Sequence, residues 1–255
     1  MLFNSLSFAV FLPIVFAIYW ALRNSLRYQN IMLLLASYFF YGWWDVRFLG
    51  LIVASTVVDY LLGQHLATAT KVSKRKLLLT ASMLFNLGLL GVFKYYNFFI
   101  GNFTEIANSI GFHTNPILLK IALPVGISFY TFQTMSYTID IYRKQLEPTK
   151  DFIAFAAFVG YFPQLVAGPI ERASNLLPQI STNRSFNYQK AVDGMRQALW
   201  GFFKKVVIAD AVAPLVDQVF SDPNGFSFIA LITGALLFSV QIYCDFSGYS
   251  DIAIG

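Results

Sequence analysis

Long apolar runs separated by short polar segments dominate the sequence. A helix needs about 20 residues, or slightly fewer, to cross a hydrocarbon core ~30 Å thick. The runs that approach this length are, in chain order, Leu6–Leu22, Asn30–Trp44, Phe48–Gly63, Leu77–Ile100, Pro116–Ile139, Asp151–Ala167 and Phe226–Cys244. This pattern predicts an all-α polytopic membrane protein with about seven or eight transmembrane or re-entrant helices.

One segment is helical in pattern but too polar for a simple span. Between Tyr188 and Phe220, charged residues interrupt the apolar positions of "YQKAVDGMRQALWGFFKKVVIADAVAPLVDQVF". Such a pattern is typical of an amphipathic helix. We therefore expect residues 188–220 to lie at the membrane interface or half-buried.

A second segment, Phe158–Arg172, carries helix breakers inside an apolar run. Pro163, Gly168 and Pro169 interrupt "FVGYFPQLVAGPIER", and backbone groups freed at membrane depth must be satisfied by protein or water. We interpret this segment as re-entrant or kinked, lining a cavity. No internal repeat and no long linker is visible, so we expect a single membrane domain over residues 1–255.

Composition and charge support a membrane location. Hydrophobic residues make up 57% of the chain and charged residues 12%, about half the usual charged fraction of a soluble domain. The net charge is +5, and basic residues cluster in the loops after the first, third and fifth runs. This alternation places the N-terminus outside and those loops in the cytoplasm. Because no basic, aromatic-interleaved surface remains, we exclude nucleic-acid binding.

Few residues suit metal or nucleophilic chemistry. The single cysteine, Cys244, excludes an internal disulfide and a cysteine-based metal site, and His65 and His113 lie far apart in predicted loops. No nucleophile elbow, phosphate-binding glycine loop or zinc-protease motif is present. We expect no metal and no bound cofactor.

Polar residues form a stripe on the helix predicted within "LPVGISFYTFQTMSYTIDIYRK". At 100° per residue, Gln133, Ser136, Tyr137 and Asp140 fall within about 100° of one another. They could line a substrate tunnel, or they could hydrogen-bond to neighbouring helices, as such residues commonly do in membranes. Both interpretations remain open from these residues alone.

A second polar group ends the chain, in "QIYCDFSGYSDIAIG". On an ideal helix Asp245 and Asp251 point about 120° apart, and Ser247 lies on another face. This suggests a buried or broken segment in which Gly248 permits the departure from helix. On these residues alone, an ordinary helix end at the interface, with Asp and Ser as caps, is the favoured interpretation.

Three ordered motifs, namely "LPVGISFYTFQTMSYTIDIYR", "FVGYFPQLVAGPIER" and "QIYCDFSGYSDIAIG", resemble the membrane-bound O-acyltransferase family. The resemblance is to its bacterial, alginate O-acetyltransferase-like branch. It implies a multi-helix bundle with a funnel through the bacterial inner membrane. The chain resembles only the N-terminal half of a member, so the implied fold is partial and incomplete at its C-terminus.

The resemblance also implies an activity and a set of lining residues. Members transfer an acyl group, here acetyl, to hydroxyls of an exported polysaccharide such as alginate. The acyl donor, acetyl-CoA or an acyl-carrier thioester, is a substrate, and the acceptor is reached through extracytoplasmic partner proteins. Residues expected along the tunnel are Gln133, Ser136, Tyr137, Asp140, Gln164, Asp245, Ser247, Tyr249 and Asp251.

The family's catalytic histidine is expected shortly after the third motif, beyond Gly255. Neither His65 nor His113 matches it, so the chain supplies no catalytic residue and is expected to be inactive alone. Alternatives are a D-alanyl-transfer protein of the teichoic-acid type, or an inactive fragment or scaffold. A transporter would also explain a polar path, but no paired half-repeat is visible.

Overall fold

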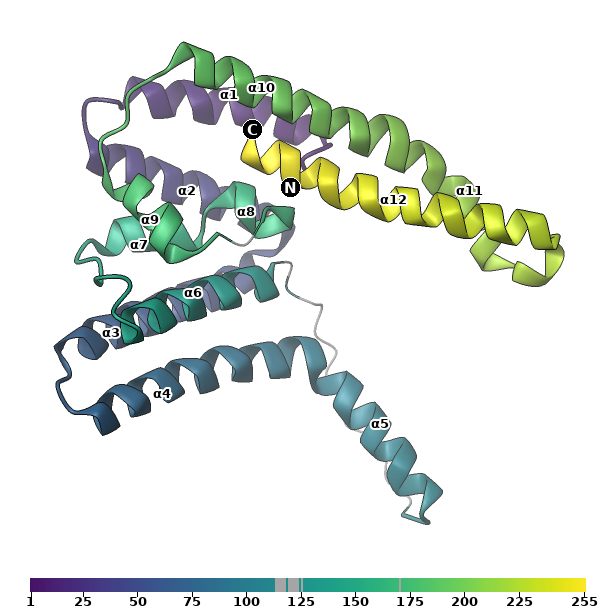
Figure 1. Ribbon diagram of the computed structural model, residues 1–255, viewed down its shortest axis with the longest axis horizontal. Helices are drawn as coiled ribbons and strands as arrows, with labels where there is room; N and C mark the ends of the chain where they lie inside the picture. The colour runs from purple at the N-terminus through teal and green to yellow at the C-terminus, as the bar shows by residue number, and fades with distance from the viewer. Residues whose placement is uncertain (113–117, 119–123, 125, 170) are drawn as a thin grey trace. The chain divides into compact units, whose positions relative to one another are not determined.

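A computed structural model describes residues 1–112, 118, 124, 126–169 and 171–255. Within these residues the regular structure is entirely helical (Figure 1). The α-helices are α1 (Leu6–Ala21), α2 (Leu26–Asp45), α3 (Leu49–Thr68), α4 (Val72–Leu90), α5 (Tyr96–Ser109), α6 (Ile127–Tyr142), α7 (Phe152–Val159), α8 (Phe162–Ala167), α9 (Ala173–Ser181), α10 (Tyr188–Phe202), α11 (Asp210–Ser221) and α12 (Phe228–Ile254). Two π-helical turns, Gly91–Tyr95 and Phe203–Ala209, join α4 to α5 and α10 to α11.

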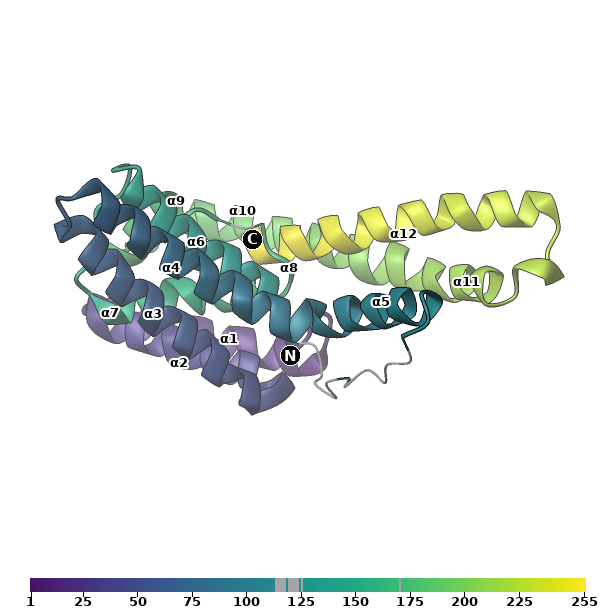
Figure 2. The same cartoon turned by 90° about the horizontal axis from the view of Figure 1, so that it is seen from below.

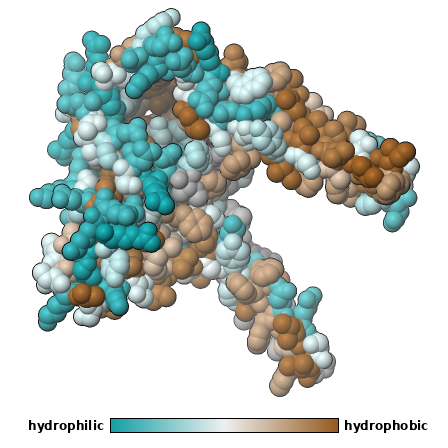
Figure 3. Space-filling view, in the orientation of Figure 1, coloured by the Kyte–Doolittle hydropathy of each residue, from teal (hydrophilic) through white to brown (hydrophobic). Residues whose placement is uncertain are grey.

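Three helical stretches of the described residues are long and apolar enough to cross a membrane. They are Leu26–Thr68, Val72–Ser109 and Phe228–Ile254, and two shorter apolar helical stretches are Leu6–Ala21 and Phe152–Leu165. Large apolar side chains stay exposed on the long stretches, and Figure 3 shows them gathered along α11, α12 and α5. Such surfaces suit lipid contact. The predicted all-α polytopic membrane class is confirmed.

The predicted apolar runs correspond to helices, with three differences. The fourth run continues through the π-turn to Ser109, and the last continues to Ile254. The run Asp151–Ala167 is divided into α7 and α8 at Gly160–Tyr161, which agrees with a kink near Phe158. The first part of the run Pro116–Ile139 lies outside the described residues, and α6 forms its second part.

The chain divides into two compact units. Unit 1 comprises Met1–Ala36, Phe162–Pro169 and Asn183–Gly255, and unit 2 comprises Ser37–Tyr161 and Ile170–Thr182. Because compact units of one chain can belong to one domain, the single membrane domain over 1–255 stays a prediction. So do the membrane depths of Phe158–Arg172 and of residues 188–220.

Unit 2 is built around α3, α4 and α6, which lie side by side (Figures 1 and 2). Helix α7 packs against α3, and α9 packs against α6 and α7. Large side chains such as Ile52, Tyr130 and Phe155 are fully buried there. Burial of apolar area is worth roughly 25 cal/mol per Å² against water, whereas in lipid close packing holds helices together.

Unit 1 is built around a long antiparallel helical hairpin. Helices α10 and α11 run along α12, and α8 also packs against α12 (Figure 1). The segment predicted to be an amphipathic helix over 188–220 is helical here, from Tyr188 to Ser221 with a π-turn in the middle. This hairpin holds the polar residues of the third motif.

Candidate functional site

Helix α12 runs without interruption from Phe228 to Ile254, through the whole third motif. The broken segment expected around Gly248 is therefore wrong. Gly248 instead allows close packing of two helices, since a Cβ there would lie 2.9 Å from the Gly201 carbonyl oxygen and 3.1 Å from the Lys205 backbone nitrogen. Small residues allow membrane helices to approach this closely.

The same contact recurs seven residues away along both helices. A Cβ on Gly194 of α10 would lie 2.5 Å from the carbonyl oxygen of Gly255, as one on Gly201 would from that of Gly248. Two glycines seven residues apart on each side of this contact thus let the backbone of α10 lie close to the C-terminal part of α12. This close approach brings the side chains of the π-turn Phe203–Ala209 within reach of α12.

Two adjacent lysines in the π-turn pair with the aspartates of the third motif. Lys204 Nζ pairs with Asp251 and donates a hydrogen bond to Ser247 Oγ. Lys205 Nζ lies 2.5 Å from Asp245 Oδ1 and 2.7 Å from Asp210 Oδ1. We call Lys204, Lys205, Asp210, Asp245 and Asp251 the lysine–aspartate cluster. π-Helical turns occur frequently at functional sites.

The pairing explains why the aspartates point in different directions. Asp245 and Asp251 project about 120° apart on a helix, and adjacent residues of the facing helix project about 100° apart. Lys204 and Lys205 therefore each reach a different aspartate. Placing charged side chains among apolar helices costs free energy, and the ion pairs compensate for this cost.

The lysines are more buried than the carboxylates they bind. The Lys205 side chain is 12% exposed, against 34% for Asp245 and 40% for Asp210. Burial disfavours the ammonium form, but the hydrogen bonds to Asp210 and Asp245 outweigh it and raise the pKa of Lys205 above its ordinary value. Lys205 is thus a fixed positive charge beside two partly accessible carboxylates.

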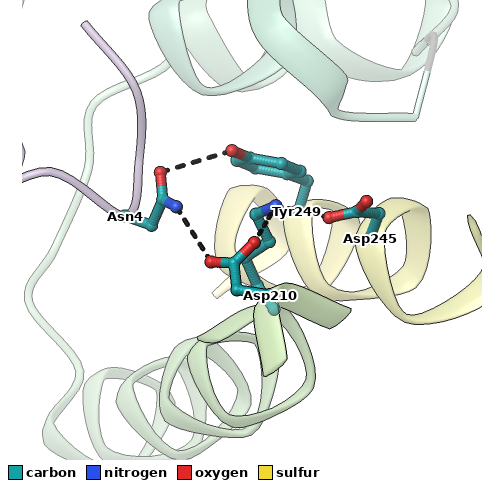
Figure 4. A network of polar contacts seen from close by, with 5 residues as sticks. Asn4, Asp210, Asp245 and Tyr249 are labelled. Carbon is teal, nitrogen blue, oxygen red and sulfur yellow. Dashed lines mark hydrogen bonds and ion pairs between the residues drawn. The ribbon is translucent and has the colours of Figure 1, made fainter. Parts of the chain in front are cut away.

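The N-terminal segment completes this side of the cluster (Figure 4). The Tyr249 hydroxyl lies 3.4 Å from Asn4 Oδ1, and Asn4 Nδ2 donates to Asp210 Oδ2 at 3.3 Å. The Tyr249 ring lies 5.4 Å from Lys205 Nζ and 5.8 Å from the Phe3 ring. This side of the cluster thus offers both hydrogen-bond donors and hydrogen-bond acceptors next to an aromatic ring, which suits recognition of a polyhydroxylated molecule. These groups belong to Asn4, Asp210, Asp245 and Tyr249.

The polar stripe of α6 lies in unit 2, where it contacts other helices. Gln133 is buried, and its Nε2 donates to the Phe158 carbonyl of α7 at 2.7 Å. Tyr137 packs on Phe155 with ring centroids 4.5 Å apart. Half-buried Ser136 donates to the Gln133 carbonyl of its own helix. Gln133 thus makes a helix–helix contact, while tunnel lining by these residues stays a prediction.

The remaining predicted site residues divide between the two units. Asp140 belongs to unit 2, is buried, and its Oδ2 makes no hydrogen bond in the described part of the chain. Gln164 is buried on α8 of unit 1, the unit that also holds Asp245, Ser247, Tyr249 and Asp251. The structure brings these last four residues together around Lys204 and Lys205.

Sequence reasoning missed Lys204 and Lys205 as partners of the third motif. It treated them as interfacial charges, although two lysines inside the apolar segment "WGFFKKVVIAD" signal a need for nearby carboxylates. It also missed Asp59, a carboxyl group inside the third apolar run. The residues that the structure describes contain no cluster of His, Cys, Asp or Glu suited to a metal.

Comparison with known proteins gives relatives over the whole chain, although no protein-family model matches it. The chain is 41% identical to "Probable alginate O-acetylase AlgI" of Azotobacter vinelandii and 42% identical to the protein of the same name from Pseudomonas aeruginosa. It is 36% identical to "Peptidoglycan O-acetyltransferase" of Helicobacter pylori. Each match covers 100% of this chain and 50%, 48% and 53% of the relative, respectively.

The chain therefore spans about half the length of the curated relatives it matches. The three motifs that carry the resemblance lie within this matched length. The resemblance is confirmed: the chain is a homologue of polysaccharide O-acetyltransferases, consistent with the N-terminal half of a membrane-bound O-acyltransferase.

Proposed function

We propose that this chain forms part of a membrane enzyme that transfers acetyl groups to hydroxyls of an exported polysaccharide. The observation that carries this proposal is the match over the whole chain to proteins named for O-acetylation of alginate or peptidoglycan. The helices long enough to span a membrane support an enzyme embedded in the bilayer. The higher identity to the alginate proteins favours alginate or a similar polymer as acceptor.

The reaction requires an acceptor hydroxyl to attack the carbonyl carbon of an acetyl thioester. The new ester C–O bond forms, the C–S bond breaks, and the hydroxyl proton passes by way of a base to the leaving thiolate. We propose acetyl-CoA or an acyl-carrier thioester as donor. The base is the histidine that the family resemblance implies after the third motif, and this chain contributes binding and orientation.

Within unit 1, the lysine–aspartate cluster is suited to bind the acceptor. The partly exposed carboxylates of Asp210 and Asp245 can accept hydrogen bonds from sugar hydroxyls, and Lys205 forms an ion pair with both carboxylates. Tyr249 offers a ring face on which a sugar can stack and a hydroxyl held by Asn4. These groups would hold the acceptor alcohol in place rather than activate it.

We further propose the bacterial inner membrane as the location, with the N-terminus outside. The basic loops support this orientation, because Arg23, Arg27, Lys71–Lys76, Arg143 and Lys144 then face the cytoplasm. The acceptor polymer would be reached on the outer side, with extracytoplasmic partner proteins.

The experiment compares variants of the full-length protein that contains this chain, reconstituted with labelled acetyl donor and acceptor. We expect Asp245→Asn and Tyr249→Phe each to lower acetyl transfer at least about tenfold with expression unchanged, since loss of one such hydrogen bond costs about 1.4 kcal/mol. Asp193→Asn, which alters an exposed carboxylate of α10, is the matched control.

Unchanged turnover in both cluster variants would rule out an acceptor site at the cluster. Parallel assays with alginate and with peptidoglycan fragments identify the polymer, since the Helicobacter pylori relative is named for the latter. Transfer of D-alanine, or no transfer to any polysaccharide by the unmodified full-length protein, would contradict the proposed activity itself.

A further inference from the structure

Two segments that lie far apart in the sequence meet at one end of unit 2. Helices α3 and α6 end on the side of the unit where α4 begins (Figures 1 and 2). Arg75, near the start of α4, donates to carbonyl oxygens in the last turns of α3 and α6, namely those of Leu66, Ile141 and Tyr142, at 2.7, 3.2 and 2.8 Å. Carbonyl groups in the last turn of a helix need partners from outside it. Arg75 supplies one for both helices and thereby holds the two segments together.

The segment after α6 is also held against α3. The Tyr60 hydroxyl donates to the Lys150 carbonyl oxygen at 2.7 Å, and Gln64 Nε2 donates to the Thr149 carbonyl oxygen at 2.5 Å. The Tyr60 ring packs on Phe152 of α7, with ring centroids 5.2 Å apart. Residues 71–76 and 143–151 thus form one surface, which we call the basic face of unit 2.

The basic face carries the whole net charge of the chain. Its basic residues are Lys71, Lys74, Arg75, Lys76, Arg143, Lys144 and Lys150. These are seven of the chain's 18 basic residues, and the face holds two of its 13 acidic residues, so the rest of the chain has basic and acidic residues in equal number. One of the two acidic residues, Asp151, is already engaged as the N-cap of α7. The basic face is therefore the part of the chain that attracts anions most strongly.

The cationic side chains of the basic face are accessible to a ligand. Six of the seven, all but that of Arg75, are exposed. None of the six takes part in an ion pair between residues that the structure describes. The lysines of unit 1 differ, since Lys204 and Lys205 are each paired with an aspartate of α12. Like charges this close repel one another, and an anion that contacts several of them reduces the repulsion.

The basic face lies where two stretches long enough to cross a membrane meet. Leu26–Thr68 ends and Val72–Ser109 begins at the α3–α4 loop. A turn between two spanning stretches lies at the membrane surface, at the level of the lipid head groups. Next to the lysines of this loop, the side chains of Val72 and Leu77 are 64% and 69% exposed. An amphiphile with an anionic head group and apolar chains matches both kinds of side chain.

We propose that the basic face of unit 2 binds anionic phospholipids, with a head-group phosphate held between lysines of the two segments. Four to eight Lys and Arg residues beside a spanning helix attract anionic lipids, with roughly a fivefold gain in affinity for each charge. Arg75 holds the two segments close enough for one head group to contact both. Lipid binding at this face does not depend on the proposed acetyl transfer.

The first test measures lipid binding by the full-length protein that contains this chain, in an uncharged detergent. The probes are fluorescent phosphatidylglycerol, which is anionic, and phosphatidylcholine, whose phosphate is balanced by a cation. We expect phosphatidylglycerol to bind at least about tenfold more tightly, and this preference to shrink between about 50 mM and about 500 mM salt, which screens exposed charges. Equal affinity for the two lipids would overturn the proposal.

A matched pair of triple variants locates the binding. Lys74→Gln/Lys144→Gln/Lys150→Gln removes three exposed charges from the basic face, and Arg172→Gln/Lys190→Gln/Arg196→Gln removes three exposed charges elsewhere. The first should weaken phosphatidylglycerol binding at least about tenfold, and the second should leave it within about twofold. Equal losses in the two variants would mean that binding follows the net charge of the protein, and would overturn the proposal.

Two double variants test whether both segments hold the same lipid. Lys74→Gln/Lys76→Gln alters only the α3–α4 side, and Lys144→Gln/Lys150→Gln alters only the segment after α6. All four positions are exposed, so the fold should be kept, which unfolding midpoints check. Each pair should weaken phosphatidylglycerol binding, and a loss with one pair alone would exclude a site shared by both segments.

A soluble anion distinguishes a lipid head group from a free phosphate compound. Inorganic pyrophosphate carries phosphate groups without acyl chains. If the face binds lipid, pyrophosphate should compete only weakly with phosphatidylglycerol, because it makes no contact with Val72 and Leu77. Tighter binding of pyrophosphate than of phosphatidylglycerol, lost in the basic-face triple variant, would assign the face to a soluble phosphate compound and overturn the lipid assignment.

Discussion

Lys205 shows most clearly what a single side chain does in this protein. It binds Asp245 of the third motif and Asp210 of its own hairpin, so both carboxylates depend on one ammonium group. A sequence can mark Asp245 as unusual because a charge inside an apolar run is costly. It cannot show which lysine neutralises that charge, because the pairing depends on a π-turn that the local pattern does not reveal.

At this scale we predict that Lys205→Met destabilises the protein by about 1–3 kcal/mol. Removing one partner of a fully buried ion pair costs about 3–5 kcal/mol, and the partial exposure of both carboxylates lowers this cost. Thermal unfolding in detergent measures it. Lys190→Met, at an exposed position of α10, is the control. Equal midpoints for the two variants would show that the cluster does not stabilise unit 1.

At the scale of helices, the apolar pattern located the three described stretches that are long enough to cross a membrane, but it misplaced several ends. The last run was expected to end at Cys244 because two aspartates follow it, yet α12 continues to Ile254. The helix continues because Lys204 and Lys205 of the π-turn form ion pairs with those aspartates. A partner on a neighbouring helix can thus extend a helix through residues that usually end one.

The packing of α10 on α12 gives a second prediction. A methyl group on Gly248 would lie 2.9 Å from the Gly201 carbonyl oxygen, so the helices must separate. We expect Gly248→Ala to cost about 1–3 kcal/mol, typical of overpacking. Nothing lies within 4 Å of a Cβ on Gly88 of α4, so Gly88→Ala should be neutral or stabilising by up to about 1 kcal/mol.

Unfolding midpoints of the two alanine variants check this contrast. Equal changes in midpoint for the two variants, or a higher midpoint for Gly248→Ala, would mean that the close approach of α10 and α12 does not limit side-chain size at Gly248. The comparison is direct because both variants carry the same substitution in different surroundings.

At the scale of the whole molecule, sequence reasoning gave the all-helical class, the membrane location and the family resemblance. These follow from composition and from motifs that lie along the chain. The two-unit division does not follow, because it depends on which distant segments pack together, such as α8 with α12. The tunnel and the membrane orientation stay predictions.

Orientation can be tested by thiol labelling of intact cells. After Cys244 is replaced by Ser, cysteines are introduced singly at Lys74 and Asn108, both exposed. With the N-terminus outside, a membrane-impermeant reagent should label position 108 in intact cells and position 74 only after permeabilisation. The reverse pattern would invert the proposed topology without affecting the fold.

The π-turn between α10 and α11 lets the chain vary in length by one residue without losing an ion pair. A π-turn holds one more residue than the α-helix it interrupts, so deleting one residue between Lys205 and Asp210 would restore regular helix and leave α11 nearly in phase with α10. The spacing of the two residues would change from five to four, and residues four apart on an α-helix face each other. Homologous chains that lack one residue here but keep Lys205 and Asp210 are therefore expected to retain this pair of charges.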